Sequence, residues 1–272
     1  MHRSGTSFLA RALNLEGVYL GKLDRIITHD WKPHKSNLRG HWENQDILTL
    51  AEKTLAHSNG KWYDPPSKIR INKQIASGIK KHVNELERHS LLASGFKDTR
   101  LLLCFDAWKK YLPKNFVVIG IFRHPLKVAE SLKIRSKFDY QKSLDLWKIY
   151  NENLLTILYK HDGFLLNFDW PKKKLLAEIQ HVSEKLGLAN VDLSEWYTRK
   201  LIKSGKTFQK DYLLPDEIKL IYSRLKKRSE NNHKVRINYT LEKREMKKII
   251  ELLLTEIQEQ GIYFKKISGK NY

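Results

Sequence analysis

An uninterrupted apolar run at residues 115–122 limits the possible folds more than any other part of the chain. It has the sequence Asn-Phe-Val-Val-Ile-Gly-Ile-Phe and is followed at once by Arg123-His124-Pro125. A continuous apolar, β-branched strand is typical of a parallel sheet that is buried on both faces. Proline suits the first position of a helix. We therefore expect an α/β fold in which this strand leads directly into a helix.

The remaining sequence alternates between strand and helix patterns, which favours a mostly parallel sheet flanked by helices. Further strands are expected at residues 17–20, 94–97 and 163–168. After a first helix that follows residue 7, helices are expected at residues 44–60, 68–91, 101–111, 141–160, 171–187, 215–230 and 240–260. From about residue 190 the strand pattern stops. We expect one domain at residues 1–190 and a basic, mainly helical extension at residues 191–272 that packs on it.

The charge balance indicates an anionic ligand without identifying it. The 272 residues include 51 Lys and Arg against 30 Asp and Glu, a net charge of +21. Such a surface attracts polysaccharides, anionic lipids, phosphorylated nucleotides or nucleic acids. Short lysine runs, such as residues 172–174 and 226–228, are more often solvated helix faces. We expect no nucleic acid partner.

Neither a membrane span nor a disulfide is expected. The longest apolar stretch, residues 116–122, is far shorter than the roughly 20 residues that cross a bilayer. Cys104 is the only cysteine, which favours a reducing compartment. With no signal peptide at the start, the expectation is a cytoplasmic protein, unless a longer chain begins upstream.

A polar loop near the start, Arg3-Ser4-Gly5-Thr6-Ser7, precedes an apolar helix pattern and predicts an anion cradle. The first N–H groups of a helix have no internal partners, so a bound phosphate can satisfy them. Gly5 permits a close approach of the backbone, while the hydroxyls of Thr6 and Ser7 and the guanidinium of Arg3 add donors. The loop lacks the second glycine and the lysine of a Walker A motif, which disfavours a magnesium-dependent NTPase. A helix start without a ligand is the competing interpretation.

A second candidate phosphate site follows the apolar strand. Arg123 stands at the carboxyl end of that strand, where α/β proteins bind ligands. Ser131 comes six residues after Pro125, within the next helix. A guanidinium and a hydroxyl together suit a second, separate phosphate.

These two motifs resemble those of the sulfotransferases that use 3′-phosphoadenosine 5′-phosphosulfate (PAPS). Residues 3–7 are similar to the 5′-phosphosulfate loop of that family, and residues 123–131 to its 3′-phosphate motif. Residues 97–100, Lys-Asp-Thr-Arg, resemble its Lys-Asp-Pro-Arg element, and residues 40–44 and 165–188 resemble further elements. The resemblance covers residues 1–190 and implies a P-loop NTPase-like fold. Family members begin with a strand before the phosphate loop, so either this chain starts upstream or its sheet lacks that strand.

The resemblance implies a PAPS-dependent sulfotransferase that needs no metal. Arg3 and the backbone of residues 4–7 would hold the 5′-phosphate, and Arg123 and Ser131 would hold the 3′-phosphate. The implied acceptor is a hydroxyl or amine of a carbohydrate or small metabolite.

The resemblance also requires a general base that deprotonates the acceptor. Glu43 is the first candidate, followed by Asp98, His41 and His34, while Lys97 would help to hold the leaving group. A carboxylate that the dipole of a helix stabilises is the competing interpretation of Glu43.

Two other functions stay open at this stage. The charge of +21 is also compatible with a non-catalytic polyanion-binding protein. The phosphate loop is also compatible with an unusual P-loop kinase.

The acceptor pocket is expected in the loops at residues 21–66 and 190–240, where sequence varies most freely. The sequence predicts neither the acceptor nor the oligomeric state.

Overall fold

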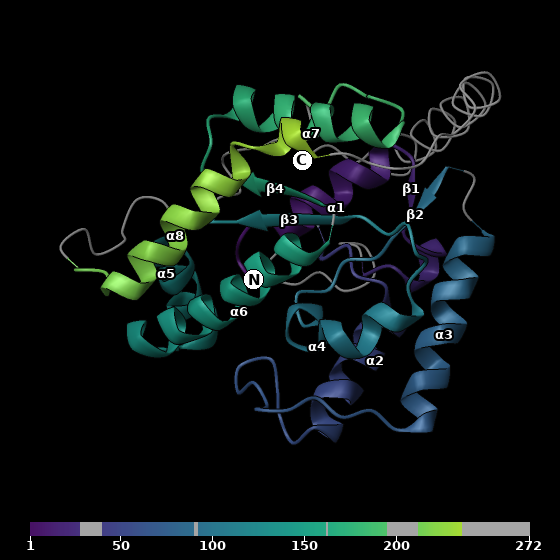
Figure 1. The fold of residues 1–272 in the computed structure, drawn as a ribbon, viewed down its shortest axis with the longest axis horizontal. Coiled ribbons are helices and arrows are strands. Elements are labelled where there is room, and N and C mark those ends of the chain that lie inside the picture. Colours follow the sequence, from purple (N-terminus) through teal and green to yellow (C-terminus); the bar gives the residue numbers. More distant parts are fainter. Residues whose placement is uncertain (28–39, 90–91, 162, 195–211, 236–272) are drawn as a thin grey trace, which may run out of the picture.

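The structure, a computed structural model, describes residues 1–27, 40–89, 92–161, 163–194 and 212–235. These residues form an α/β fold in which helices surround two small parallel sheets (Figure 1). The helices are α1 (Thr6–Leu15), α2 (Gln45–His57), α3 (Lys73–Arg88), α4 (Leu101–Trp108), α5 (Pro125–Ser136), α6 (Tyr140–Lys160), α7 (Lys172–Leu186) and α8 (Asp216–Ser229). The strands are β1 (Val18–Tyr19), β2 (Ala93–Ser94), β3 (Val118–Phe122) and β4 (Gly163–Asn167).

The strands pair in two separate sheets. β1 lies parallel to β2, with Val18 opposite Ala93, and β3 lies parallel to β4, with Val118 opposite Gly163. The predicted parallel pairing is confirmed. A single sheet was expected, but β2 and β3 belong to different sheets, because no described strand lies between them. The P-loop NTPase-like arrangement stays a prediction.

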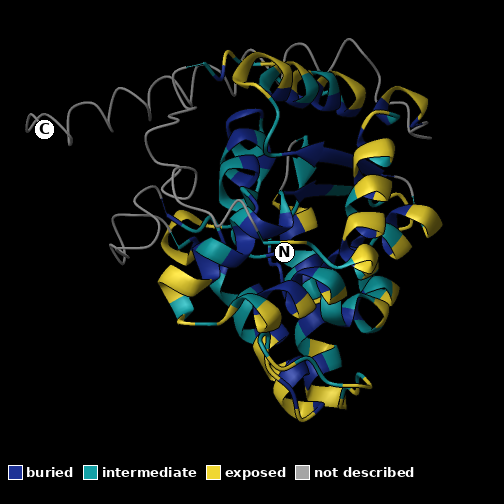
Figure 2. Cartoon of the chain, turned by 90° about the vertical axis from the view of Figure 1, so that its left-hand side faces the viewer, coloured by how far each residue is buried: buried dark blue, intermediate teal, exposed yellow. Residues whose placement is uncertain are grey.

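Sheet β3–β4 is buried on both faces, as its apolar sequence predicts. Phe122 and Leu165 pack with side chains of α6 and α8 on one face. Ile121 and Leu166 pack with α1 and α7 on the other. Figure 2 shows this layering, with buried strands at the centre and the exposed residues on the outer faces of the helices.

Capping residues explain where several helices begin and end. Asn44 caps α2 by accepting hydrogen bonds from the N–H groups of Asp46 and Ile47, as predicted. Pro125 is the first residue of α5, also as predicted. The helix expected from residue 68 instead begins at Lys73, because the side chain of Asn72 accepts a hydrogen bond from the N–H of Ile75.

Two other expected boundaries were wrong. The helix expected at residues 101–111 ends at Trp108, and a 3₁₀ turn, Lys109–Tyr111, follows it. The strand expected at residues 94–97 is Ala93–Ser94, after which the chain turns away towards the candidate site.

The chain beyond residue 190 contributes to the core. Helix α8 packs against α6 and β4. Asn232 lies in the 3₁₀ turn Asn232–Lys234; its Oδ1 accepts a hydrogen bond from Leu165 N and its Nδ2 donates one to Leu165 O, both at 3.0 Å. One side-chain amide thus pairs with the outer edge of β4. The helix expected at residues 240–260 lies outside the described residues.

In the described part of the chain, no helix has both the length and the apolar composition needed to cross a bilayer.

Candidate functional site

The polar loop expected before α1 is present, and two of its residues have left-handed backbones. These are Arg3 and Gly5, with φ of 66° and 86°. Glycine is required at position 5, because a Cβ there would lie 2.3 Å from the ring of Phe168. Gly5 is the N-cap of α1, and no side chain caps this helix start. The loop therefore presents the positive end of a helix dipole at the surface that Phe168 borders.

Ser4 adds a buried donor to this loop. Its side chain is completely buried, and its Oγ has no hydrogen-bond partner among the described residues. A buried hydroxyl normally has a partner. An orphan hydroxyl in this loop fits a polar ligand.

The three side chains assigned to phosphate binding converge in space. Arg3 Nε donates a hydrogen bond to Ser131 Oγ at 2.7 Å, across 128 residues of sequence. Arg123 Nη1 donates to the carbonyl oxygen of Arg3 at 3.5 Å. The sequence predicted two separate pockets, whereas Arg3 and Ser131 are in direct contact here. A nucleotide that used both would have to come between them.

Strand β3 and helix α5 position the second half of this cluster. Arg123 directly follows β3 and is 5% exposed, and Ser131 lies in the second turn of α5. The guanidinium of Arg123 also lies over the ring of Phe168, 5.5 Å from its centre. Phe168 thus contacts both phosphate motifs. Sequence analysis missed this role, although an aromatic residue just after a buried strand was a possible signal.

Asp169 partly neutralises the positive charge at the end of β3. Its carboxylate accepts hydrogen bonds from Lys127 Nζ and from the N–H of His124, both at 2.7 Å, and Arg123 Nε lies 3.7 Å away. This counter-charge was also missed, because only the parallel pairing of β3 with β4 brings Asp169 beside Arg123.

The segments at residues 40–44 and 97–100, which resemble two family elements, meet beside the loop. Lys97 Nζ donates to Glu43 Oε1 at 2.5 Å and to the carbonyl oxygen of His41 at 3.2 Å. Burial tends to raise the pKa of Glu43, but the charges of Lys97 and Arg100 outweigh it and the pKa is lowered. Glu43 is therefore an ionised, buried carboxylate held by one lysine.

Asp98 has a different environment from Glu43. Both of its oxygens accept hydrogen bonds from Arg100 Nη1 at 3.0 Å, and Oδ1 also accepts one from Arg100 N. Burial raises the pKa of Asp98 to about 6, against the opposing charge of Arg100. With both oxygens engaged, Asp98 orients Arg100 and is less available than Glu43 as a base.

His2 links the loop before α1 to the segment at residues 97–100. It was not among the candidates from sequence. Its Nε2 lies 2.8 Å from Thr99 Oγ1, and its ring packs on Trp62 at 4.6 Å between ring centres. Burial, followed by the charge of Arg100, lowers its pKa well below 6.5. His2 is therefore a neutral imidazole near pH 7. Its position beside the predicted phosphate loop was the signal available in the sequence.

Cations outnumber carboxylates in this region. Arg135, exposed in the last turn of α5, is a further cation that sequence analysis missed, and its charge contributes to lowering the pKa of Arg3 to about 10, after burial. The cations are Arg3, Lys97, Arg100, Arg123, Lys127 and Arg135, and the carboxylates are Glu43, Asp98 and Asp169. This excess suits a ligand with several negative charges.

Comparison with known proteins adds no information about this site. No family model, no curated protein and no solved structure matches the chain. His34 lies outside the described residues, and those that are described contain no cluster of three or more His, Cys, Asp or Glu that could hold a metal ion. The interpretation of the site depends on its geometry and charge.

Proposed function

We propose that the chain is a sulfotransferase that moves a sulfuryl group from PAPS to a hydroxyl or amine acceptor. The observation that supports this most directly is the meeting of Arg3, Arg123 and Ser131 at the carboxyl end of β3 and the start of α1. These residues come from two motifs some 120 residues apart. In the proposal, both motifs bind one nucleotide.

Each motif takes one phosphate of that nucleotide. The N–H groups at the start of α1, the Ser4 hydroxyl and Arg3 bind the 5′-phosphate, and Arg123 and Ser131 bind the 3′-phosphate. Binding requires Arg3 to exchange Ser131 for a phosphate oxygen. Phe168, which contacts Gly5 and Arg123, provides an apolar surface beside both motifs.

The reaction exchanges one sulfur–oxygen bond for another bond to sulfur. The bond between sulfur and the 5′-phosphate oxygen breaks as sulfur bonds to the acceptor oxygen or nitrogen. The acceptor proton passes to a base, and adenosine 3′,5′-bisphosphate leaves. Arg3 and the helix N–H groups stabilise the charge that develops on the leaving phosphate, so the proposed step needs no metal ion.

Glu43 is our assignment for the base. Its carboxylate is ionised, and it is held by Lys97 beside the phosphate loop. We expect Glu43→Gln to lower kcat by about 10²- to 10⁴-fold, the usual contribution of a general base, with little change in bisphosphate affinity. If Glu43→Gln retains activity and His2→Gln loses it, the imidazole is the base instead.

Calorimetry with defined nucleotides tests the proposal. Adenosine 3′,5′-bisphosphate is expected to bind without metal and more tightly than ATP with Mg²⁺. Arg123→Ala should weaken the bisphosphate by about 10- to 100-fold, in line with the loss of a charged hydrogen bond, but barely change the affinity for adenosine 5′-phosphate. Equal losses for the two nucleotides would show that Arg123 does not bind the 3′-phosphate.

Arg228→Ala provides the matched control. Arg228 is also a partly buried arginine, but it donates to the carbonyl oxygen of Gly163 at the amino end of β4, away from the site. Arg228→Ala should leave the affinities for adenosine 3′,5′-bisphosphate and for adenosine 5′-phosphate unchanged. Absence of bisphosphate binding in the unaltered protein would overturn the proposal.

The charge of +21 supports a second candidate, a polyanion-binding protein without catalysis. Binding of heparin together with no response to the bisphosphate would favour it.

A further inference from the structure

Arg135 is a cation at the candidate site that has no role in the proposed binding of the two phosphates. It lies in the last turn of α5, and its side chain is exposed. In the part of the chain that the structure describes, its guanidinium has no hydrogen bond and no ion pair. An arginine in the last turn of a helix interacts favourably with the helix dipole wherever its side chain points. The direction of Arg135 therefore has to come from its neighbours.

The spacing of residues on α5 directs Arg135 towards the loop before α1. Residues four positions apart lie on the same face of a helix, and Arg135 comes four residues after Ser131. Ser131 Oγ accepts a hydrogen bond from Arg3 Nε at 2.7 Å, so this face of α5 is turned towards the loop. Arg135 therefore lies one helical turn beyond the contact between Arg3 and Ser131.

The chain that follows α5 contacts the aromatic residues around His2. Lys137 has a left-handed backbone, with φ of 59°, and ends the helix. Phe138 then packs on Trp62, with ring centres 5.8 Å apart, and Trp62 packs on His2 at 4.6 Å. The end of α5 thus lies on the same side of the molecule as His2 and the loop that follows it.

The electrostatic influence of Arg135 agrees with this position. Burial is the main cause of the lowered pKa of Arg3 and of His2, and the charge of Arg135 contributes to both. Burial also lowers the pKa of Arg135 itself, and the carboxylate of Glu43 opposes that change. Arg135 is therefore close both to Arg3, the proposed ligand of the leaving phosphate, and to Glu43, the proposed base.

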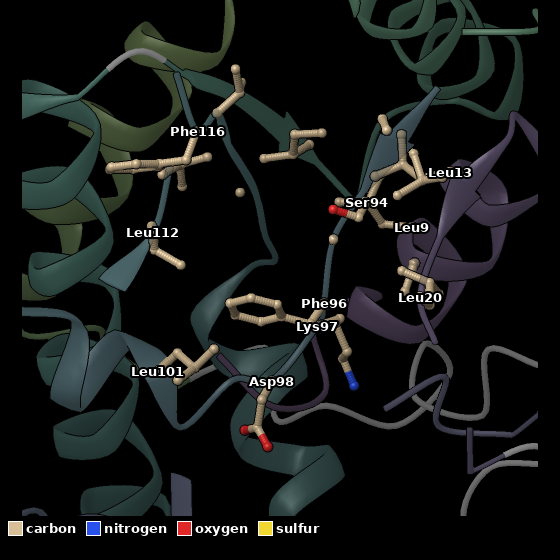
Figure 3. A pocket seen from close by; sticks show the side chains of 18 of the residues that line it. Leu9, Leu13, Leu20, Ser94, Phe96, Lys97, Asp98, Leu101, Leu112 and Phe116 are labelled. Carbon is tan, nitrogen blue, oxygen red and sulfur yellow. The ribbon is translucent and has the colours of Figure 1, made fainter. Parts of the chain in front are cut away.

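Other cations at the site already contact oxygen atoms of the protein. Figure 3 shows an example at one end of an apolar cavity, where the charged ends of Lys97 and Asp98 point apart, each towards its own partner. The pairs are Lys97 with Glu43, Arg100 with Asp98, Lys127 with Asp169, and Arg123 with the carbonyl oxygen of Arg3. A ligand that binds Arg135 breaks no such contact between described residues.

The proposed reaction requires a position for the sulfuryl group between Arg3 and Glu43. In an in-line transfer, the sulfur lies between the leaving phosphate oxygen, which Arg3 stabilises, and the acceptor atom, whose proton passes to Glu43. The other oxygens of the sulfuryl group carry negative charge, and the residues proposed for the two phosphates and the base leave them without a cation. A guanidinium can donate two parallel hydrogen bonds to such a group.

We propose that Arg135 binds the sulfuryl group of PAPS, an inference that rests on the proposed function. Its guanidinium donates hydrogen bonds to the non-bridging oxygens and keeps the sulfur in line between the leaving oxygen and the acceptor. The bond from sulfur to the 5′-phosphate oxygen breaks as the bond to the acceptor forms, and the acceptor proton goes to Glu43. Because adenosine 3′,5′-bisphosphate lacks the sulfuryl group, Arg135 makes the protein bind the donor more tightly than the product.

Calorimetry with the donor and the product, in the absence of an acceptor, measures this difference directly. Arg135→Gln should weaken PAPS binding by about 10- to 100-fold, in line with the loss of charged hydrogen bonds. It should barely change the affinity for adenosine 3′,5′-bisphosphate. Arg135→Lys keeps the charge but not the planar group, so its affinity for PAPS should lie between those of Arg135→Gln and the unaltered protein.

Lys133→Gln provides the matched control. Lys133 is also an exposed cation in the last turn of α5, but its ammonium lies over the ring of Tyr140, 5.4 Å from the ring centre. This variant should leave the affinities for PAPS and for the bisphosphate unchanged.

The ratio of the two affinities separates the possible outcomes. If Arg135 only stabilises the end of α5, Arg135→Gln lowers Tm and leaves the ratio unchanged, which would overturn the inference. Equal losses for PAPS and the bisphosphate would also overturn it, and the proposed function would stand. If the unaltered protein does not bind the bisphosphate, the proposed function fails and the inference fails with it, so the two failures are distinguishable.

Discussion

At the residue scale, the buried imidazole of His2 makes stability depend on pH. Burial, followed by the charge of Arg100, lowers its pKa well below 6.5 in the folded protein. The unfolded chain therefore binds more protons than the folded protein as the imidazole titrates, and this group makes the free energy of unfolding rise with pH. Asp98, with a pKa raised to about 6, opposes it.

We therefore expect His2→Gln, which removes the imidazole, to reduce the rise in the free energy of unfolding between about pH 5.5 and pH 7.5. Urea titrations of both proteins at several pH values measure this rise. The same pH dependence in His2→Gln and in the unaltered protein would place the titration elsewhere.

Gly5 is a second position where one residue determines local structure. Its φ is 86° and a Cβ would contact the ring of Phe168, so Gly5→Ala should cost about 1–3 kcal/mol and also weaken bisphosphate binding. Gly17→Ala is the matched control: φ is 100° there, but the closest side-chain atom, of Leu92, lies 3.2 Å away. Urea unfolding and calorimetry should show a stability loss for both variants and a binding loss for Gly5→Ala alone. If the two variants bind the bisphosphate with equal affinity, the loop that contains Gly5 does not bind this ligand.

At the element scale, sequence patterns predicted the type of each element better than its ends. Apolar periodicity identified α3 and α6, and the continuous apolar run identified β3, because these patterns reflect burial that persists along the whole element. The start of α3 was predicted too early, since the apolar pattern begins before the residue that caps the helix, Asn72. A cap depends on one hydrogen bond, which periodicity does not contain.

Asn232 is an element-scale contact that no local pattern predicts. Its amide pairs with both backbone groups of Leu165, 67 residues away, and its side chain is buried. Asn232→Leu should leave a buried N–H and C=O unpaired and lower the free energy of unfolding by about 1–3 kcal/mol or more. Asn231→Ala, which removes an exposed hydrogen bond to Lys227 O, should have a much smaller effect. Similar losses for the two variants would mean that water replaces the Asn232 amide.

At the scale of the whole molecule, the sequence located the candidate site but not its internal contacts. Arg3 was assigned from the free N–H groups expected at the start of a helix, and Arg123 from the rule that ligands bind at the carboxyl ends of parallel strands. The contact between Arg3 and Ser131, and the Asp169 carboxylate beside Arg123, depend on how the sheets and helices pack in three dimensions. Sequence analysis left open that the sheet lacks a strand, but the split into two pairs depends on which strands are neighbours, and local patterns do not contain that information.

The distribution of charge over the molecule leads to a final prediction. The candidate site holds partly buried cations such as Arg3 and Arg123, whereas the lysines of α7 and α8, such as Lys173 and Lys227, are exposed. Salt screens exposed charges more strongly than buried ones. Raising the NaCl concentration should therefore weaken heparin binding steeply and bisphosphate binding much less, as titrations at several salt concentrations would measure.

Lys173→Glu, an exposed change on α7, should lower the affinity for heparin and leave the affinity for the bisphosphate unchanged. If the bisphosphate instead showed the same salt slope as heparin and the same sensitivity to Lys173→Glu, it would be binding to the general basic surface rather than between Arg3 and Arg123.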